Sequence, residues 1–143
     1  MLASGPELLE LIPQRPPMVM VDRLMSCNGP ETVTQLLVNQ SNIFLSEGKF
    51  TVSGLMECMA QTAAVRTGWL LKNHATGANK KAPVGVIGGI KNFKLHYQPV
   101  EGELLTTTLE VQLELSQATV VQAKVQAGDR LAAEAELKIF LTE

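Results

Sequence analysis

The sequence is poor in the residues that build metal sites and disulfide frameworks. Its 143 residues include two cysteines and two histidines. Cys27 and Cys58 stand far apart with no paired spacing and no neighbouring histidine, which argues against both a structural metal site and a disulfide. We therefore expect two free buried thiols, no metal and no cofactor.

The chain also lacks a charge excess and any long apolar run. Its 12 Lys and Arg residues and 14 Asp and Glu residues give a net charge of -2 and form no basic stripe, so nucleic acid is not an expected partner. No segment reaches the roughly 18 uninterrupted apolar residues of a membrane span. The opening MLASGPELLELIPQ has no basic leader and does not read as a signal peptide. The cytoplasm is the expected location.

What the sequence does contain is a clear order of secondary-structure patterns. A short amphipathic helix is predicted over residues 6–12, ending at Pro13. Two consecutive prolines lead into a β-rich run at 18–27. A turn at 28–30 connects that run to a second strand at 31–39, so the two strands are expected to form a hairpin.

The middle of the chain changes to good helix formers. The pattern predicts a helix over about 52–73, with Ser53 as its N-cap. Its apolar residues fall on nearly every side, which is typical of a helix surrounded by protein. The polar segment NHATGANKKAP, residues 73–83, is expected to be an exposed and mobile loop.

The second half of the chain reads as strands. Turn signals at EGE, SQ and GD separate four segments, at 83–100, 104–117, 118–128 and 130–143. Apolar and polar residues alternate in two of them, which predicts one covered and one wet face. The apolar positions of this alternation are Leu109, Val111, Leu113, Leu115, Val121, Ala123 and Val125. A long apolar helix needs a curved sheet around it, so we predict an α+β fold with an antiparallel sheet.

Three segments carry a resemblance to a known family. They are LIPQRPPMVMVDRL at 11–24, GLMECMAQTAA at 54–64 and FKLHYQPVEGELL at 93–105. They resemble the hotdog-fold β-hydroxyacyl-acyl-carrier-protein dehydratases. The ungapped spacing from Phe44 to Glu57 resembles a divergent branch of that family found with aryl-polyene and related pigment synthesis. The resemblance implies one hotdog domain over residues 1–143, working as a dimer.

The resemblance implies that Glu57 is a catalytic acid/base and that a histidine from the opposite subunit works with it. At the place of that histidine this sequence reads QSNIFLSEGKF, and no histidine occurs from Met1 to Asn73. The histidine of the opening signature is Gln14 here. Elimination of water needs a base and an acid, and an imidazole suits one of these tasks near neutral pH. Asn42 can position a group but cannot exchange a proton.

Other residues are candidates for roles around Glu57. Gln61 lies one turn further on the same helix face, so it is a second catalytic candidate. It either holds Glu57 or a thioester carbonyl, or is a core amide bonded to the backbone. Backbone N–H groups near the glycines suit a thioester oxygen, and a thioether suits an acyl tunnel. The substrate-binding candidates are Asn42, Phe44, Gly54, Met56 and Gly89.

Two further sites have structural alternatives. His96 is either a displaced catalytic histidine or a sheet-face histidine. Asp22 and Arg23 are expected to be an opposite-charge pair that pins the hairpin to its neighbours. The glycines of GVIGGIKNF are expected to allow a β-bulge or a close backbone approach.

Three functions remain open from the sequence. In the first, the chain is a hydro-lyase that acts on acyl-carrier-protein or CoA thioesters, and water, His96 or a partner chain takes the part of the histidine. Alternatively, it is an inactive acyl-thioester-binding protein or heterodimer partner of a related hotdog chain. Third, it is a thioesterase, since related folds hydrolyse thioesters with a helix carboxylate. A homodimer or a heterodimer is expected in each case.

Overall fold

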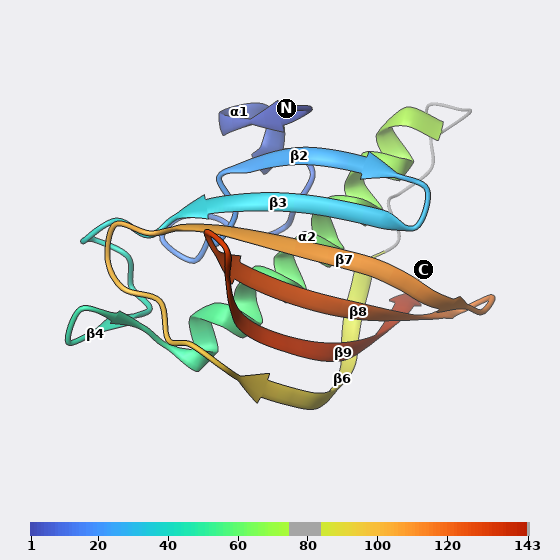
Figure 1. Ribbon diagram of the computed structural model, residues 1–143. Helices are drawn as coiled ribbons and strands as arrows, with labels where there is room; N and C mark the ends of the chain where they lie inside the picture. Colours follow the sequence, from blue (N-terminus) through green and yellow to red (C-terminus); the bar gives the residue numbers. More distant parts are fainter. Residues whose placement is uncertain (75–83, 143) are drawn as a thin grey trace.

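The apolar middle of the chain forms one long helix, α2, and a curved antiparallel sheet wraps around one side of it (Figure 1). The computed structural model describes residues 1–74 and 84–142. The elements are β1 (Ala3–Ser4), α1 (Gly5–Leu9), β2 (Arg23–Asn28), β3 (Glu31–Leu37), β4 (Leu45–Ser46), β5 (Lys49–Phe50), α2 (Val52–His74), β6 (Val84–Leu95), β7 (Leu104–Glu114), β8 (Ala118–Ala127) and β9 (Arg130–Thr142). The predicted α+β fold is confirmed, and the loop predicted at 73–83 lies almost wholly outside the described residues.

The large sheet has seven strands in the order β1-β2-β3-β7-β8-β9-β6. All its pairs are antiparallel. Because β6 stands last in the strand order, it is an edge strand that pairs with β9 on one side. The hairpin predicted between the first two long strands is confirmed as β2–β3. The small β4–β5 hairpin, which directly precedes α2, and the two-residue β1 were not predicted.

The helix α2 begins at Val52, and its N-cap is Thr51. The Thr51 hydroxyl accepts a hydrogen bond from the Gly54 N–H at 3.3 Å. The Thr51 N–H in turn donates to the Phe44 carbonyl at 2.9 Å, which fixes this residue at the end of the β4–β5 hairpin. The prediction that Ser53 is the N-cap was wrong, because Ser53 already lies within the helix.

The N-terminal elements are shorter than predicted. Helix α1 ends at Leu9 and continues as a single turn, with the Leu11 N–H donating to the Leu8 carbonyl at 2.9 Å. Strand β2 starts at Arg23 and not at Met18. The reason is that residues 18–20 hydrogen-bond to a side chain of α2 and not to β3.

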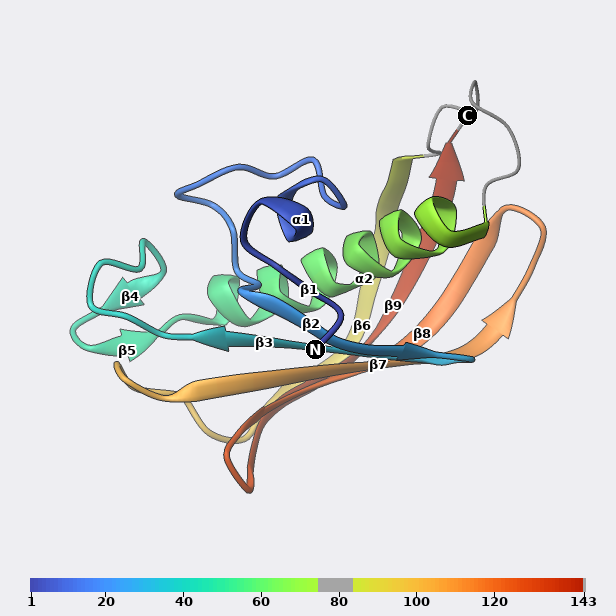
Figure 2. The ribbon, with the colours of Figure 1, turned by 90° about the horizontal axis from the view of Figure 1, so that it is seen from above.

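Two apolar clusters hold α2 in place. On the sheet side, Leu55 and Met59 are buried against strand residues such as Leu109 and Leu137. On another side, Val65 packs with Leu8 of α1 and its neighbours. Figure 2 shows α2 lying between the sheet and α1. A third side stays partly exposed, and its residues near the start of the helix are Met56, Glu57 and Ala60.

The predicted alternation holds in β8 and fails at the end of β7. Val121, Ala123 and Val125 are buried as expected. A bulge between Val111 and Leu113 shifts the register, and Leu113 is 52% exposed. A one-residue shift turns every following side chain to the other face. The expectation that Leu113 and Leu115 face the covered side was therefore wrong.

Candidate active site

Glu57 lies in the second turn of α2, on the side that neither apolar cluster covers. Its carboxylate oxygen Oε2 accepts a hydrogen bond from Gln61 Nε2 at 2.8 Å. This is the one-turn pairing expected for residues four apart on a helix face. The carboxylate of Glu57 is thus held by a neighbour while it remains partly exposed.

Gln61 is fully buried and uses both ends of its carboxamide. Its Oε1 accepts the Met20 N–H at 2.6 Å, and its Nε2 donates to the Met18 carbonyl at 2.8 Å as well as to Glu57. Because a carboxamide carries two N–H donors, no donor of Gln61 is left for a thioester carbonyl. Two of the roles considered for Gln61, holding Glu57 and satisfying the backbone, occur together.

Three of the predicted binding residues gather at the start of α2. Asn42 Oδ1 accepts the Phe44 N–H at 2.8 Å, and Asn42 Nδ2 lies 3.3 Å from the sulfur of Met20. A Cβ at Gly54 would lie 2.8 Å from the Cβ of Phe44 and 2.6 Å from the ring of Phe50. Gly54 therefore lets two aromatic side chains pack against the first turn of the helix.

The other two binding candidates lie in α2 and in β6. Met56 precedes Glu57 and is partly exposed. Gly89 lies in β6, where the register shifts between Ile87 and Gly89, so the predicted bulge is confirmed. The close approach is made by Gly88, whose missing Cβ leaves room for the Phe140 ring. Neither Met56 nor Gly89 lines the pocket described next.

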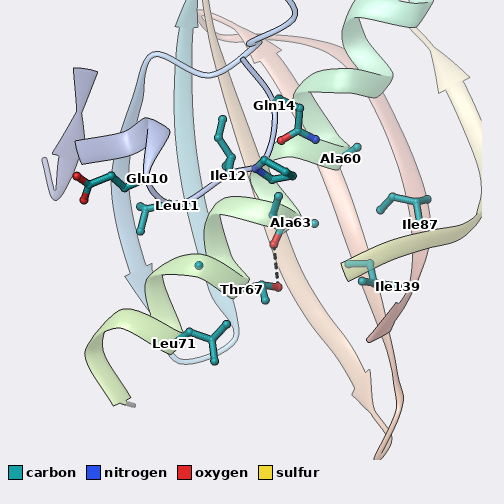
Figure 3. A pocket seen from close by; sticks show the side chains of 13 residues that line it. Glu10, Leu11, Ile12, Gln14, Ala60, Ala63, Thr67, Leu71, Ile87 and Ile139 are labelled. Carbon is teal, nitrogen blue, oxygen red and sulfur yellow. Dashed lines mark hydrogen bonds between the residues drawn. The ribbon is translucent and has the colours of Figure 1, made fainter. Parts of the chain in front are cut away.

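A pocket of about 290 Å³ runs along the open side of α2 (Figure 3). One wall is the segment Glu10–Gln14, and the other is formed by Ile87 of β6 and Ile139 of β9. Its floor is α2, and the helix residues that line it are Ala60, Ala63, Ala64, Thr67, Gly68 and Leu71. The lining residue nearest to Glu57 along α2 is Ala60, one helical turn later, and Glu57 itself does not line the pocket.

Sequence reasoning did not foresee the part that the N-terminal segment takes in this site. The backbone of residues 18–20 anchors Gln61, and Gln14 lines the pocket. The Gln14 oxygen Oε1 is buried and has no hydrogen-bond partner. The replacement of the family's signature histidine by Gln14 was the only sequence signal at this position.

His96 lies on a face of the sheet, where it contacts Glu134. Its Nε2 lies 2.9 Å from Glu134 Oε2, and Glu134 alternates along β9 with the buried Ala133 and Ala135. Since alternate residues of a strand point to opposite faces, Glu134 and His96 lie on the face away from α2. His74, the other histidine, is the last residue of α2, roughly 25 Å along the helix from Glu57.

Asp22 pins the β2–β3 hairpin, but not through an ion pair with Arg23. Its Oδ2 accepts the Leu37 N–H at 2.7 Å, and its own N–H donates to the Gln35 carbonyl at 2.7 Å. Within residues 1–74 and 84–142 no ion pair joins Asp22 to Arg23. The predicted structural role of Asp22 is right and the predicted charge pairing is wrong.

Both cysteines are free, and Cys58 is buried beside the candidate site. Cys27 is only partly buried, so the expectation of two buried thiols was wrong for that residue. Burial raises the pKa of the Cys58 thiol well above its usual range, and the neighbouring carboxylate of Glu57 adds to this effect.

Among the residues that the structure describes, no cluster of three or more His, Cys, Asp or Glu side chains could hold a metal ion. No helix in that part of the chain is long and apolar enough to cross a membrane.

Solved structures share this architecture. The structure of the dehydratase heterocomplex ApeI:P from Xenorhabdus doucetiae aligns with a TM-score of 0.84 and 16% identity, over 95% of this chain and 91% of that chain. A hypothetical thioesterase with coenzyme A from Streptococcus pneumoniae aligns with a TM-score of 0.67 and 14% identity, over 84% of each chain. At these identities the likenesses show the fold, which is the hotdog fold predicted from the sequence.

Relatives in sequence show which class of hotdog protein this chain resembles. The 3-hydroxyacyl-acyl-carrier-protein dehydratase FabZ of Ruminiclostridium cellulolyticum is 29% identical over 150 residues, covering 99% of both chains. FabZ of Chlamydia abortus is 30% identical over 147 residues, covering 96% of this chain and 90% of that relative. Fold and relatives together define a hotdog protein of the dehydratase class. Residues 6–143 match the ApeP-like dehydratase family, and the chain belongs to that family.

Proposed function

We propose that this chain takes part in the dehydration of 3-hydroxyacyl thioesters, with Glu57 as one of the two proton-transfer groups. The observation that carries this proposal is the carboxylate of Glu57, which Gln61 holds on the partly exposed side of α2, one helical turn before the residue at which an apolar pocket begins. A carrier-bound acyl chain matches this arrangement, because its apolar tail suits the pocket and its reacting carbon lies next to a polar group. The FabZ relatives act, by name, on 3-hydroxyacyl-acyl-carrier-protein substrates.

The reaction needs two proton transfers. A base removes a proton from C2, the C3–oxygen bond breaks, and an acid protonates the leaving hydroxyl, which gives a 2-enoyl thioester and water. Glu57 supplies one carboxyl group for these steps. Gln61 is a positioning residue, because its Nε2 orients Glu57 and it has no free donor for the substrate. Asn42, Phe44 and Gly54 shape the start of α2, and Gly54 lies about one turn before Glu57.

The second group is supplied by another chain. The edge strand β6 leaves one side of the sheet open for pairing with a second subunit, and the open side of α2 adjoins it through the pocket. If two copies paired through β6, their sheets would continue and each His96 would stay on the outer face, away from Glu57. We therefore favour a heterodimer with a related hotdog chain that carries the missing histidine. ApeI:P, the structural neighbour, is a heterocomplex.

The test is a dehydration assay on the full chain, alone and mixed with a histidine-bearing hotdog chain of the same family. The substrates are 3-hydroxyacyl thioesters of acyl carrier protein and of CoA, and the readout is loss of water by mass spectrometry. We expect activity in the mixture, reduced about 100-fold or more by Glu57→Gln. The matched control is Glu110→Gln, which changes an exposed carboxylate of β7.

Other results would change the proposal. Full activity of Glu57→Gln would remove Glu57 from the reaction. Activity of the chain alone, lost in His74→Ala or His96→Ala, would show that a homodimer uses its own histidine. Release of free thiol would indicate a thioesterase, and binding without turnover in every mixture would indicate an inactive binding protein.

The cytoplasm remains our proposed location, because the two free cysteines, Cys27 and Cys58, suit a reducing compartment.

A further inference from the structure

One polar atom of the pocket along α2 has no partner. Gln14 lines the pocket, and its oxygen Oε1 is buried without a hydrogen bond (Figure 3). The turn that carries Gln14 is closed by Arg15, whose Nη1 donates to the carbonyls of Leu9, Ile12 and Gln14 at 3.0, 2.8 and 2.7 Å. The backbone at Gln14 is therefore tied down, and its side chain extends from a fixed turn.

The surroundings of Gln14 select the kind of ligand that suits it. An amide oxygen only accepts hydrogen bonds, and a buried acceptor without a partner destabilises the protein. The other residues of the pocket offer little that could donate a hydrogen bond to the Gln14 oxygen. The Thr67 hydroxyl, a possible donor, already donates to the Ala63 carbonyl at 3.2 Å. Leu11, Ile12, Ile87 and Ile139 make the walls apolar. A fitting ligand is apolar along most of its length and carries one donor near Gln14.

We propose that Gln14 accepts a hydrogen bond from the 3-hydroxyl of the acyl chain and so selects 3-hydroxyacyl groups over saturated ones. This inference rests on the proposed function. Ala60 and Gln14 both line the start of the pocket, and Ala60 lies one turn from Glu57. When a thioester binds with C2 at Glu57 and its tail runs past Ala60 into the pocket, the hydroxyl on the adjacent C3 is directed towards Gln14. Gln14 is then a specificity-determining residue, and its bond is lost when water leaves.

The test compares two ligands and one nearly isosteric variant. The ligands are amide analogues of 3-hydroxyoctanoyl-pantetheine and octanoyl-pantetheine, and calorimetry measures their binding to the full chain, alone and with its partner chain. We expect the wild type to prefer the hydroxylated analogue about tenfold. In Gln14→Met this preference disappears while octanoyl affinity is kept. The control Gln126→Met, on an exposed residue of β8, keeps the preference.

A second measurement separates this role from a purely structural one. Because Gln14→Met removes an unpaired buried acceptor, the melting temperature of the ligand-free variant should rise by roughly 3 °C. Equal binding of both analogues by the wild type would overturn the inference and leave the proposed function standing. A preference retained in Gln14→Met, or a variant that changes only subunit association, would also overturn it. If neither analogue binds, the proposed function fails as well.

Discussion

Gln61 is the residue on which three parts of the candidate site depend. Its side chain joins α2 to the backbone at Met18 and Met20 and orients the carboxylate of Glu57. No other side-chain contact of the described residues links the N-terminal segment, the helix and the acid in one group. The same amide therefore contributes to stability and to the arrangement of the reacting carboxyl.

Replacing Gln61 by leucine should affect both properties. Gln61→Leu leaves the buried Met20 N–H and the partly buried Met18 carbonyl without partners, so we expect a loss of about 1–3 kcal/mol in the free energy of unfolding, measured with urea. Gln61→Glu keeps an acceptor for the Met20 N–H but places a second carboxyl beside Glu57. Two carboxyl groups this close resist ionising together, so the acidic limb of the pH–rate profile should move to higher pH.

The two variants test different claims about Gln61. A leucine variant as stable as the wild type would contradict the buried hydrogen bonds. An unchanged pH–rate profile of Gln61→Glu would contradict the link between Gln61 and the proton-transfer group, even if that variant is less stable.

At the scale of elements, the close approach of α2 to the N-terminal segment forms one wall of the pocket. Gly68 is the point of contact, because a Cβ there would overlap the backbone carbonyl of Leu11. Ala60 and Ala64 also line the pocket, and their small side chains fill little of its volume. Small residues on this side of α2 are thus what makes room for a ligand.

Gly68→Ala should destabilise the protein although alanine favours helices. Alanine gains about 1 kcal/mol of helix propensity over glycine. Overlap with a backbone atom must displace the segment at Leu11, so we expect a net loss of about 1–3 kcal/mol on urea denaturation. Gly89→Ala is the matched control, since a Cβ there meets no atom within 4 Å. An increase in stability of Gly68→Ala would show that the segment does not pack as closely as described.

At the scale of the whole molecule, Cys58 makes stability depend on alkaline pH. Its thiol is buried in the main core between α2 and the sheet, and burial raises its pKa far above the ordinary value of 9.0. Below pH 9 the thiol is neutral in both the folded and the unfolded chain. Above pH 9 the unfolded chain ionises and the folded chain does not, so stability falls as the pH rises.

We expect this loss to be about 1.4 kcal/mol per pH unit above pH 9. It is measured as the difference in urea stability between the wild type and Cys58→Ala, which removes the titrating group. The same burial should protect Cys58 from thiol reagents until the molecule unfolds. Equal pH slopes for the two proteins, or rapid labelling of Cys58 in the native state, would contradict this account.

The open edge at β6 is also a property of the whole molecule. It is the long strand at which the sheet ends, and its residue Ile87 lines the pocket between the sheet and α2. A second subunit pairing there would cover the partly exposed side of α2. The assembly, and not one chain, is therefore the unit in which we expect the reaction.

The sequence by itself determined the main elements and the acid of the candidate site. The run of helix formers predicted α2 to within a residue of its observed bounds, and turn signals separated the later strands, because these patterns depend on neighbours along the chain. The segments at 11–24, 54–64 and 93–105 also indicated the family to which the chain belongs.

Only the tertiary structure decided which groups meet. The partners of Gln61 come from residues 18–20, about forty positions earlier in the chain, and the same bonds draw that segment away from the sheet. The bulge before Leu113 and the outer-face position of His96 depend on strand register. Gln14 became a candidate when its oxygen was found buried beside the pocket. Such contacts follow from how distant segments pack, which local patterns do not encode.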